Sequence, residues 1–387
     1  MADRKLHICI DCGGSKTAAA VSTYIQEPIL VSRGYGGPSN YKDNGLKVFL
    51  SAIRQAAQDA LTHALGIPIS LPTVDNVLTA PDDVIENHRS YLYSAWIGAS
   101  GVDAAQDVLT LSPLLSRLLG VPLTPQRLMV QNDSHILSSP LLTTAESVRE
   151  SIVAIAGTGS VVVSFRRQKL SPQDASETIV QLARAGGWGY LLGDEGSGFR
   201  AGREAIREVL RTFNESDLDE EPPVSESQTN NLRSMILAHF NLRSPEDLFS
   251  VVYAPDSVPK SFVDRDGERP RWTEVDRKSR IVELCPLVFH AAFQLKDKSA
   301  IRALRTSLGG LAKQVSSLCT GAGVRPSSKR ISAPSAVLCL GGSLFKVNEY
   351  RELFIEELET YGQRFGQVVY IEDACKGGAL GLAKLFP

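Results

Sequence analysis

The chain has 387 residues, a formal net charge of −2 and 43% hydrophobic residues. This length suits two domains of a globular protein, each with its own hydrophobic core. The near-neutral charge gives no reason to expect nucleic acid or an acidic membrane surface as a partner. Small molecules are therefore the expected ligands.

Targeting and cysteine patterns predict a cytoplasmic protein. Residues 1–7 carry charges with no apolar stretch behind them, and no later run approaches the roughly 20 apolar residues of a membrane helix. The six cysteines are scattered, as is usual for reduced thiols. Cys9 and Cys12 spell C-x-x-C, but the pair ends a predicted strand, which favours buried thiols over a zinc or redox centre. The six histidines show no metal-binding spacing.

The first part of the chain has the pattern of a mixed α/β domain. In chain order it predicts strands over 6–10, 17–25 and 29–32, a helix over 48–65, a strand over 91–97, a helix over 108–119 and a strand over 128–131. The last strand ends at Asn132 and Asp133. This places a carboxylate at the carboxyl end of a strand, where open α/β sheets bind ligands.

The second part restarts the same pattern, as an internal duplication would. It predicts a hairpin over 152–165, helices over 199–209, 281–293 and 301–319, a buried strand ending in the turn at 341–343, and a short helix opening at 377. Residues 214–231 are acidic and lack apolar periodicity, so they are predicted to form a surface loop. Residues 255–273 form a second polar interruption.

Two glycine-rich turns are the most informative motifs. Residues 11–17 read Asp-Cys-Gly-Gly-Ser-Lys-Thr, and residues 156–160 read Ala-Gly-Thr-Gly-Ser. Glycine lets backbone N–H groups approach a phosphate, and the neighbouring hydroxyl groups can donate to its oxygens. Asp11, at a strand end, can hold the Mg²⁺ that neutralises phosphates. One such turn would suggest only a tight hairpin, but two, about one domain length apart, predict a nucleotide clamp.

With these turns, Asn132-Asp133, the block from Gly186 to Ser197 and Gly341-Gly-Ser343 in this order, the chain resembles the N-acetylglucosamine kinase family. That family belongs to the BadF/BadG/BcrA/BcrD-type ATPases of the actin-like and sugar-kinase superfamily. The resemblance implies an α/β fold of two ribonuclease-H-like domains with ATP and sugar in the cleft between them. The domains would span 1–140, joined by the C-terminal helix 377–387, and 141–376, with polar insertions near 214–231 and 255–273.

The resemblance also implies roles for individual residues. The nucleotide would contact Gly13, Gly14, Ser15, Gly157, Thr158, Gly159, Ala292, Gly341 and Gly342. The amino sugar would contact Asn40, Asp133, Gly187, Trp188, Gly189 and Asp194. Asp133 would also be the catalytic base and Asp11 the Mg²⁺ anchor. The chain departs from the family pattern at Ser15, where threonine is common, at Cys12, where glycine is common, and at Ser134-His135, where small residues are usual.

Each assignment has a structural alternative. Asp133 could be a turn aspartate that bonds its own backbone, and Asp194 and Glu195 could favour the start of the helix at 199. Trp188 could be a core aromatic, although its glycine neighbours cannot pack it and aromatic faces suit sugar rings. Phosphoryl transfer needs phosphate cradles, a Mg²⁺ carboxylate and one proton acceptor, and the sequence offers all three.

The resulting prediction is an ATP-dependent kinase that phosphorylates the 6-hydroxyl of N-acetylglucosamine or a close N-acyl hexosamine. Its partners would be sugar and ATP, and a homodimer is compatible with the sequence. Three alternatives remain: a kinase of another hexose or an N-acetylmuramic-acid-like sugar, a non-catalytic sugar sensor, and an electron-activating ATPase. The sensor is disfavoured because Asp11 and Asp133 are both present. The ATPase is disfavoured because the only close cysteine pair lies at the first phosphate turn.

Overall fold

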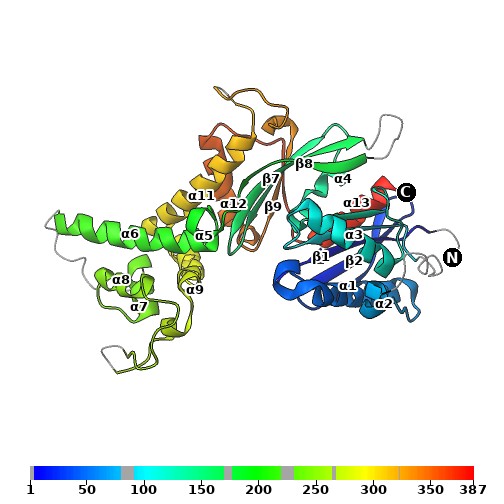
Figure 1. The fold of residues 1–387 in the computed structure, drawn as a ribbon. Helices are drawn as coiled ribbons and strands as arrows, with labels where there is room; N and C mark the ends of the chain where they lie inside the picture. Colours follow the sequence, from blue (N-terminus) through cyan, green and yellow to red (C-terminus); the bar gives the residue numbers. More distant parts are fainter. Residues whose placement is uncertain (1–3, 80–90, 170–176, 219–230, 264–266, 322) are drawn as a thin grey trace.

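Two five-stranded mixed sheets, one from each half of the chain, form the framework of the protein (Figure 1). The computed structural model describes residues 4–79, 91–169, 177–218, 231–263, 267–321 and 323–387. Helices pack against both sheets, so the α/β class predicted from the sequence is confirmed. None of the helices within the described ranges is long and apolar enough to cross a membrane.

The first sheet has the strand order β3-β2-β1-β4-β5. Its strands are β1 (His7–Cys12), β2 (Thr17–Tyr24), β3 (Pro28–Gly36), β4 (Ser94–Ala99) and β5 (Leu128–Gln131). Its helices are α1 (Tyr41–Leu65), α2 (Val74–Thr79) and α3 (Ala105–Leu119). The first three strands form antiparallel hairpins, as predicted, whereas β4 and β5 run parallel to β1. The carboxyl ends of β1, β4 and β5 therefore meet at one edge of the sheet.

Helix α1 begins seven residues before the predicted helix start at 48. Asn40 caps it, because its Oδ1 accepts the N–H groups of Lys42 and Asp43 at 3.0 and 3.3 Å. The first turn is polar, and Gly45 interrupts it with a φ of 74°. Apolar periodicity therefore begins only after the kink, which is why the sequence pattern misses the cap.

The second sheet has the strand order β10-β9-β6-β7-β8. Its strands are β6 (Glu150–Ala156), β7 (Ser160–Lys169), β8 (Glu177–Gly186), β9 (Val337–Gly341) and β10 (Gln367–Tyr370). The helices of this half are α4 (Pro140–Thr143), α5 (Gly189–Leu192), α6 (Gly198–Leu218), α7 (Leu232–Phe240), α8 (Leu248–Val252), α9 (Arg277–Val282), α10 (Cys285–Phe289), α11 (Lys298–Leu318) and α12 (Asn348–Thr360). The predicted hairpin over 152–165 is confirmed as β6 and β7.

The last helix, α13 (Ala374–Leu385), returns to the first sheet and packs against β1 and β2 (Figure 1). The Sγ of Cys375 donates to the carbonyl oxygen of Cys9 at 2.8 Å, and the Oγ of Ser22 donates to the carbonyl oxygen of Ala379 at 2.6 Å. This packing agrees with a first domain that includes the C-terminal helix. The domain limits at 140 and 376 stay predictions.

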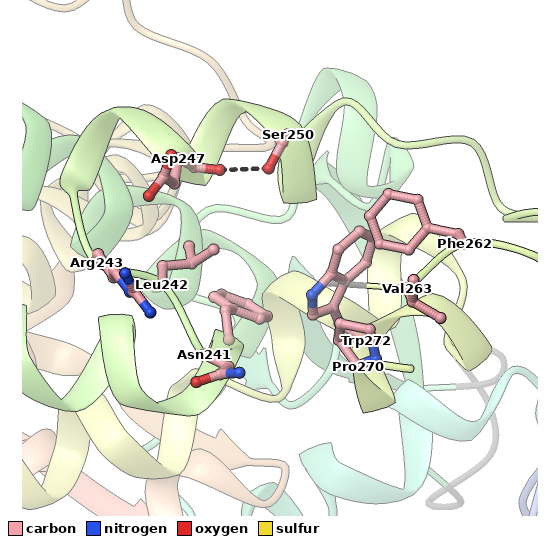
Figure 2. Close-up of a pocket in the computed structure, with 10 residues that line it drawn as sticks. Asn241, Leu242, Arg243, Asp247, Ser250, Phe262, Val263, Pro270 and Trp272 are labelled. Atoms are coloured by element: carbon pink, nitrogen blue, oxygen red, sulfur yellow. Dashed lines mark hydrogen bonds between the residues drawn. The ribbon is translucent and has the colours of Figure 1, made fainter. Parts of the chain in front are cut away.

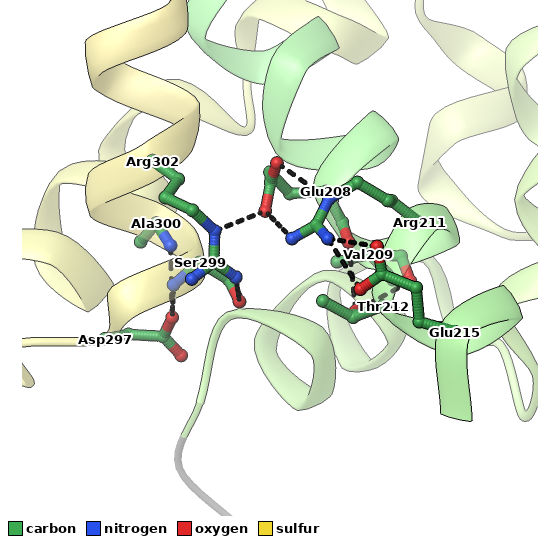
Figure 3. Close-up of polar contacts among 9 residues, drawn as sticks. All are labelled: Glu208, Val209, Arg211, Thr212, Glu215, Asp297, Ser299, Ala300 and Arg302. Atoms are coloured by element: carbon green, nitrogen blue, oxygen red, sulfur yellow. Dashed lines mark hydrogen bonds and ion pairs between the residues drawn. The ribbon is translucent and has the colours of Figure 1, made fainter. Parts of the chain in front are cut away.

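The expectation of a loop from 214 onward is wrong for its first residues, because α6 continues to Leu218. Ion pairs replace the missing apolar periodicity there (Figure 3). Arg211 contacts Glu208 at 2.9 Å and Glu215 at 2.5 Å, one helical turn to either side, and such spacings stabilise an exposed helix. Arg302 of α11 also contacts Glu208, at 3.0 Å. Residues 219–230 lie outside the described residues.

Candidate functional site

A polar pocket of about 420 Å³ lies between the two sheets and contains two of the predicted sugar-binding residues, Asn40 and Asp133. The first half of the chain contributes Asn40, Lys42, Asp43, Ser100, Gly101, Asp103, Asn132, Asp133 and Ser134 to its lining, and the second half contributes Val161, Val163, Gln181 and Arg184. The first group comes from the carboxyl ends of β4 and β5 and from the start of α1. A pocket of this size accommodates a monosaccharide.

Asp133 opens the 3₁₀ helix η2 (Asp133–Ser138) directly after β5. Asn132 caps this helix, accepting the Ser134 N–H at 3.0 Å, and thereby fixes the position of Asp133. Burial raises the pKa of the Asp133 carboxyl, and the negative charge of Asp103 adds to the rise. The Ser134 N–H and the Arg184 guanidinium act in the opposite direction. A carboxylate made more basic in a pocket suits a general base.

The segment that carries Asn40 is fastened to the first glycine turn. Thr17 Oγ1 donates to the carbonyl oxygen of Gly37 at 2.7 Å and lies 2.6 Å from Ser39 Oγ, within hydrogen-bond distance. The Ser39 N–H donates to the carbonyl oxygen of Gly13 at 3.0 Å. Thr17, whose hydroxyl the sequence predicts as a phosphate donor, therefore uses that hydroxyl to hold the segment before Asn40 against the first glycine turn.

Sequence reasoning missed a second polar group in the pocket, centred on Asp103. Its carboxylate accepts from Asn132 Nδ2 at 3.1 Å and from Lys42 Nζ at 2.9 Å. Asp103 lies in the loop between β4 and α3, just beyond the glycine turn at 98–101. In the sequence, only this glycine turn indicates a site near Asp103, because Lys42 and Asn132, which bond Asp103, lie far away along the chain.

Asp11 lies near the end of β1, where Ala18 and Gly98 pair with it. Burial raises the pKa of its carboxyl to about 7, with further contributions from Asp133 and Asp373. The negative charges of Asp133 and Asp373 thus repel the charge of the Asp11 carboxylate. An added cation would relieve that repulsion, so the chemistry fits Mg²⁺, whose preferred ligands are carboxylates and water. No group of three or more metal-binding side chains is preassembled among the described residues.

The second glycine turn joins β6 to β7 and is held from two directions. The Gly157 N–H donates to the carbonyl oxygen of Gly159 at 2.9 Å, and the Gly198 N–H donates to the carbonyl oxygen of Gly157 at 2.8 Å. Asp194 Oδ1 accepts the Ser160 N–H at 3.1 Å. Asp194 is buried and has a φ of 57°. Through the bond to Ser160, its carboxylate contacts the second glycine turn. Its assignment to the sugar remains a prediction.

The predicted adenosine loop follows β9 and lies beside the second turn. A Cβ on Gly157 would lie 3.7 Å from Ser343 Oγ. Gly342 has a φ of 93°, and a Cβ there would collide with the backbone of Ala156, so only glycine fits this position. Ala292 is only 1% exposed and lies in the π-helical turn His290–Gln294.

The block from Gly187 to Gly189 presents an exposed tryptophan. Trp188 is 66% exposed, which excludes the core-aromatic alternative. Leu191 and Leu192 of α5 are also exposed. The residues that line the 420 Å³ pocket do not include this block, Asp194 or the glycine turns. The structure thus places Asn40 and Asp133 in one pocket and leaves the other predicted contacts around it.

A second pocket, of about 380 Å³, lies in the helical part of the second half (Figure 2). It is lined by Phe240, Asn241, Leu242, Arg243, Asp247, Ser250, Phe262, Val263, Pro270 and Trp272. None of the predicted site residues is among them. The carboxyl ends of β4 and β5, where α/β sheets bind ligands, lie instead at the first pocket.

Comparison with known proteins supports the sequence resemblance. The chain is 29% identical to an N-acetyl-D-glucosamine kinase from Dictyostelium discoideum over 253 residues, 65% of this chain and 66% of that protein. It is 28% identical to an N-acetylmuramic acid/N-acetylglucosamine kinase from Clostridium acetobutylicum over 259 residues, 67% of each chain. The chain therefore matches about two thirds of the length of these relatives. No protein-family model matches it.

Solved structures resemble the whole fold. A candidate N-acetylglucosamine kinase from Chromobacterium violaceum superimposes with a TM-score of 0.54 at 20% identity, covering 98% of this chain and 99% of that chain. A similar protein from Porphyromonas gingivalis gives a TM-score of 0.51 at 18% identity, covering 97% and 98%. At these identities the likeness concerns the fold. Together with the curated relatives, it confirms the predicted resemblance to the N-acetylglucosamine kinase family.

Proposed function

We propose that this chain is an ATP-dependent sugar kinase that phosphorylates the 6-hydroxyl of N-acetylglucosamine or a close N-acyl hexosamine. The observation that carries the proposal is Asp133, a partly buried carboxylate with a raised pKa in a sugar-sized pocket between the sheets. The two curated relatives, both named as kinases of N-acetylglucosamine, support the same activity. No part of this assignment needs a group outside the motifs already described.

In the reaction, Asp133 accepts the proton of the 6-hydroxyl as that oxygen attacks the γ-phosphorus of ATP. Asn40 and the Asp103 group position the sugar by hydrogen bonds. The turns at 13–15 and 157–159 contact the phosphates through their N–H groups, and the loop at 341–342, with Ala292, contacts the adenosine. Gly187, Trp188, Gly189 and Asp194 complete the sugar site when the cleft closes.

Asp11 is the proposed Mg²⁺ anchor, and the bound ion would supply neutralisation of phosphate charge. The negative charge of Asp133, which contributes to the raised pKa of the Asp11 carboxyl, supports this assignment, because a bound cation would stabilise the ionised form of Asp11. The positive charge of Lys16 acts in the opposite direction and lowers the pKa of the Asp11 carboxyl. We also propose a cytoplasmic location and sugar and ATP as the partners. A homodimer is an open proposal.

N-Acetylmuramic acid is the second candidate substrate, because the name of the Clostridium relative includes it. That sugar carries a carboxylate, and the pocket contains two cationic side chains, Lys42 and Arg184.

A coupled ADP-release assay over a panel of sugars, with and without Mg²⁺, tests the function. We expect sugar-dependent ADP release that needs Mg²⁺ and is fastest with N-acetylglucosamine. The panel includes N-acetylmuramic acid, glucose and N-acetylmannosamine, so the same experiment ranks the substrates. Sugar binding by calorimetry without any ADP release would instead identify a sensor.

A further inference from the structure

Arg184 of β8 belongs to the pocket that contains Asp133, although it comes from the other sheet. Its positive charge lowers the pKa of the Asp133 carboxyl, so the two groups interact across the cleft. Neither the glycine turns nor the resemblance assigns a role to Arg184. A guanidinium facing the proposed base therefore needs its own explanation.

An irregularity in β8 places Gln181 on the same face as Arg184, beside the pocket. In the pairing with β7, Ala183 lies opposite Ser164 and Gln181 lies opposite Phe165, so Leu182 has no partner. This β-bulge reverses the alternation of side chains, and as a result Gln181 and Arg184 both line the pocket. Leu182 and Ala183 instead pack against the core of the second half. Bulges often re-aim side chains beside active sites.

The guanidinium group of Arg184 rests against the backbone of Gly187. Its Nη2 donates to the carbonyl oxygen of Gly187 at 3.3 Å, and a Cβ on Gly187 would collide with the same nitrogen. Gly187 also has a φ of 70°. The glycine is therefore required twice, for its own backbone conformation and for the space that Arg184 occupies.

The two cations of the pocket differ in their partners. Lys42 is neutralised by Asp103 at 2.9 Å. Arg184, by contrast, has no carboxylate within 4.0 Å among the described residues. Its planar donors match the oxygens of a phosphate or a carboxylate, which it can bind with two parallel hydrogen bonds. The guanidinium of Arg184 thus bonds one backbone carbonyl oxygen, that of Gly187, and forms no ion pair among the described residues, so it can bind an anion in the pocket.

We propose that Arg184 is a catalytic residue that binds the phosphoryl group during its transfer and in the product. This inference rests on the proposed kinase function. The bond between the sugar O6 and the γ-phosphorus forms, the bond from that phosphorus to the bridging oxygen of ADP breaks, and the O6 proton passes to Asp133. Arg184 contacts the equatorial phosphoryl oxygens, whose charge it stabilises as in other phosphoryl-transfer enzymes.

Binding of the product without nucleotide gives a test that does not depend on turnover. Calorimetry with N-acetylglucosamine 6-phosphate and with N-acetylglucosamine is done on the full chain and on Arg184→Gln. We expect product affinity to fall about 10- to 100-fold, since a charge-assisted pair is lost. Sugar affinity should change less than about twofold. In the ADP-release assay, kcat should fall by about 10²- to 10³-fold, below the upper range for arginine fingers because Arg184 is solvent-exposed.

Two further variants separate charge from structure. Arg184→Lys keeps the charge but not the paired donors, so it should recover part of kcat and of product affinity. Arg364→Gln removes one exposed positive charge in the segment after α12, where Arg364 pairs with Glu359, and should match the wild type. Circular dichroism confirms that each variant is folded.

Three results would overturn the proposal. Equal losses of sugar and product affinity would mean that Arg184 only supports the Gly187 backbone. Unchanged product affinity with weaker binding of N-acetylmuramic acid would assign Arg184 to a substrate carboxylate. An active wild type with an unaffected Arg184→Gln would remove the role altogether. If the wild type itself neither binds sugar nor releases ADP, the kinase function fails instead, which is a different outcome.

Discussion

The two sheets share one topology but carry different chemistry. In each, a three-strand antiparallel unit is followed by two parallel strands, β1 to β5 in the first half and β6 to β10 in the second. Even a β-bulge recurs between the second and third strands, at Val21/Ser22 and at Ser164/Phe165. The comparison shows that the repeated framework supplies positions, and that side chains at equivalent positions decide the function.

The fifth strands show this division of roles. β5 ends at Asp133, whose carboxylate faces the pocket. After β10, Asp373 instead caps α13, accepting the Lys376 N–H at 2.8 Å, and forms an ion pair with Arg33. In the proposed reaction one aspartate is the base, whereas its counterpart stabilises the fold.

The third strands differ in the opposite sense. β3 is covered by α1, because Gly34 and Gly36 bring the helix backbone into contact at Ala56, Ala60 and Ala52. In β8, by contrast, the side chains of Gln181 and Arg184 line the pocket. The first sheet thus contributes a carboxylate to the pocket after its fifth strand, and the second contributes a guanidinium from its third strand.

The largest expected effect concerns the two aspartates. Asp133→Asn should lower kcat by about 10²- to 10⁴-fold, the usual contribution of a general base, with ATP affinity nearly unchanged. Asp373→Asn is the matched control. It should lower the melting temperature through the lost ion pair while kcat changes less than about tenfold. The coupled assay and thermal denaturation measure both. Near-wild-type turnover of Asp133→Asn would contradict the assignment.

The glycine turns test whether both sheets contact the nucleotide. A Cβ on Gly157 would lie 3.7 Å from Ser343 Oγ, an ordinary contact, so the fold has room for a side chain there. A Cβ on Gly13 would lie 3.2 Å from the Lys16 carbonyl oxygen, so a side chain there needs only a small shift of the backbone. Gly13→Val and Gly157→Val should weaken Mg·ATP binding about 10- to 100-fold by excluding phosphate from the N–H groups.

Calorimetry measures these affinities, and circular dichroism checks the fold. Gly309→Val, on α11 and away from the turns, is the control and should bind ATP normally. Unaltered affinity in both turn variants would remove the nucleotide assignment. A loss in only one of them would show that the duplicated turns have diverged in function.

How far the sequence predicts this molecule depends on whether the signal is local. Both hairpins and their glycine turns were predictable, because turn and strands are adjacent in the chain. β8 was not, since its bulge and its polar cleft-facing side chains hide the strand alternation. Asp133 was marked by its place after β5. Arg184 and Asp103 acquire a role only when distant segments meet, which no local pattern records.

Domain closure tests whether the two sheets act together. Trp188 is 66% exposed, whereas Trp96 and Trp272 are 1% and 7% exposed, so sugar binding should change mainly the Trp188 fluorescence. Binding of N-acetylglucosamine should also make the protein more compact in small-angle scattering. Without the sugar, the ATPase activity should stay low. Sugar and ATP should each increase the affinity of the protein for the other ligand, about fivefold or more. Because the coupling is reciprocal, the two factors should be equal.

Trp188→Phe is the optical control and should lose the fluorescence change while the scattering change remains. Scattering profiles that are identical with saturating sugar, together with rapid ATP hydrolysis without sugar, would contradict a closing kinase and indicate a different ATPase.

The smallest expected effect concerns stability in the first sheet. His7 of β1 is fully buried, bonds Ser94 Oγ at 2.8 Å and contacts the Tyr93 ring edge-on. Burial lowers its pKa to about 4, and Lys5 and Arg127 contribute to the shift. In the unfolded chain His7 binds a proton near pH 6.5, whereas in the folded chain it does so only near pH 4. The contribution of neutral His7 to the free energy of unfolding is therefore fully present above pH 6.5 and is lost as the pH falls from 6.5 to 4.

His7→Gln removes this titration and keeps a group that can bond Ser94. At pH 5 the wild type should have lost roughly 2 kcal/mol through His7, so the pH dependence of unfolding free energy between pH 7.5 and 5 should be shallower by about that amount in the variant. His135, whose pKa burial also lowers to about 4, titrates in both proteins and cancels in the comparison. Urea denaturation at each pH measures the difference, with the exposed His63→Gln as control. Parallel pH profiles for wild type and His7→Gln would show that His7 is not held neutral by the first sheet, and that the stability of this half depends on pH through other groups.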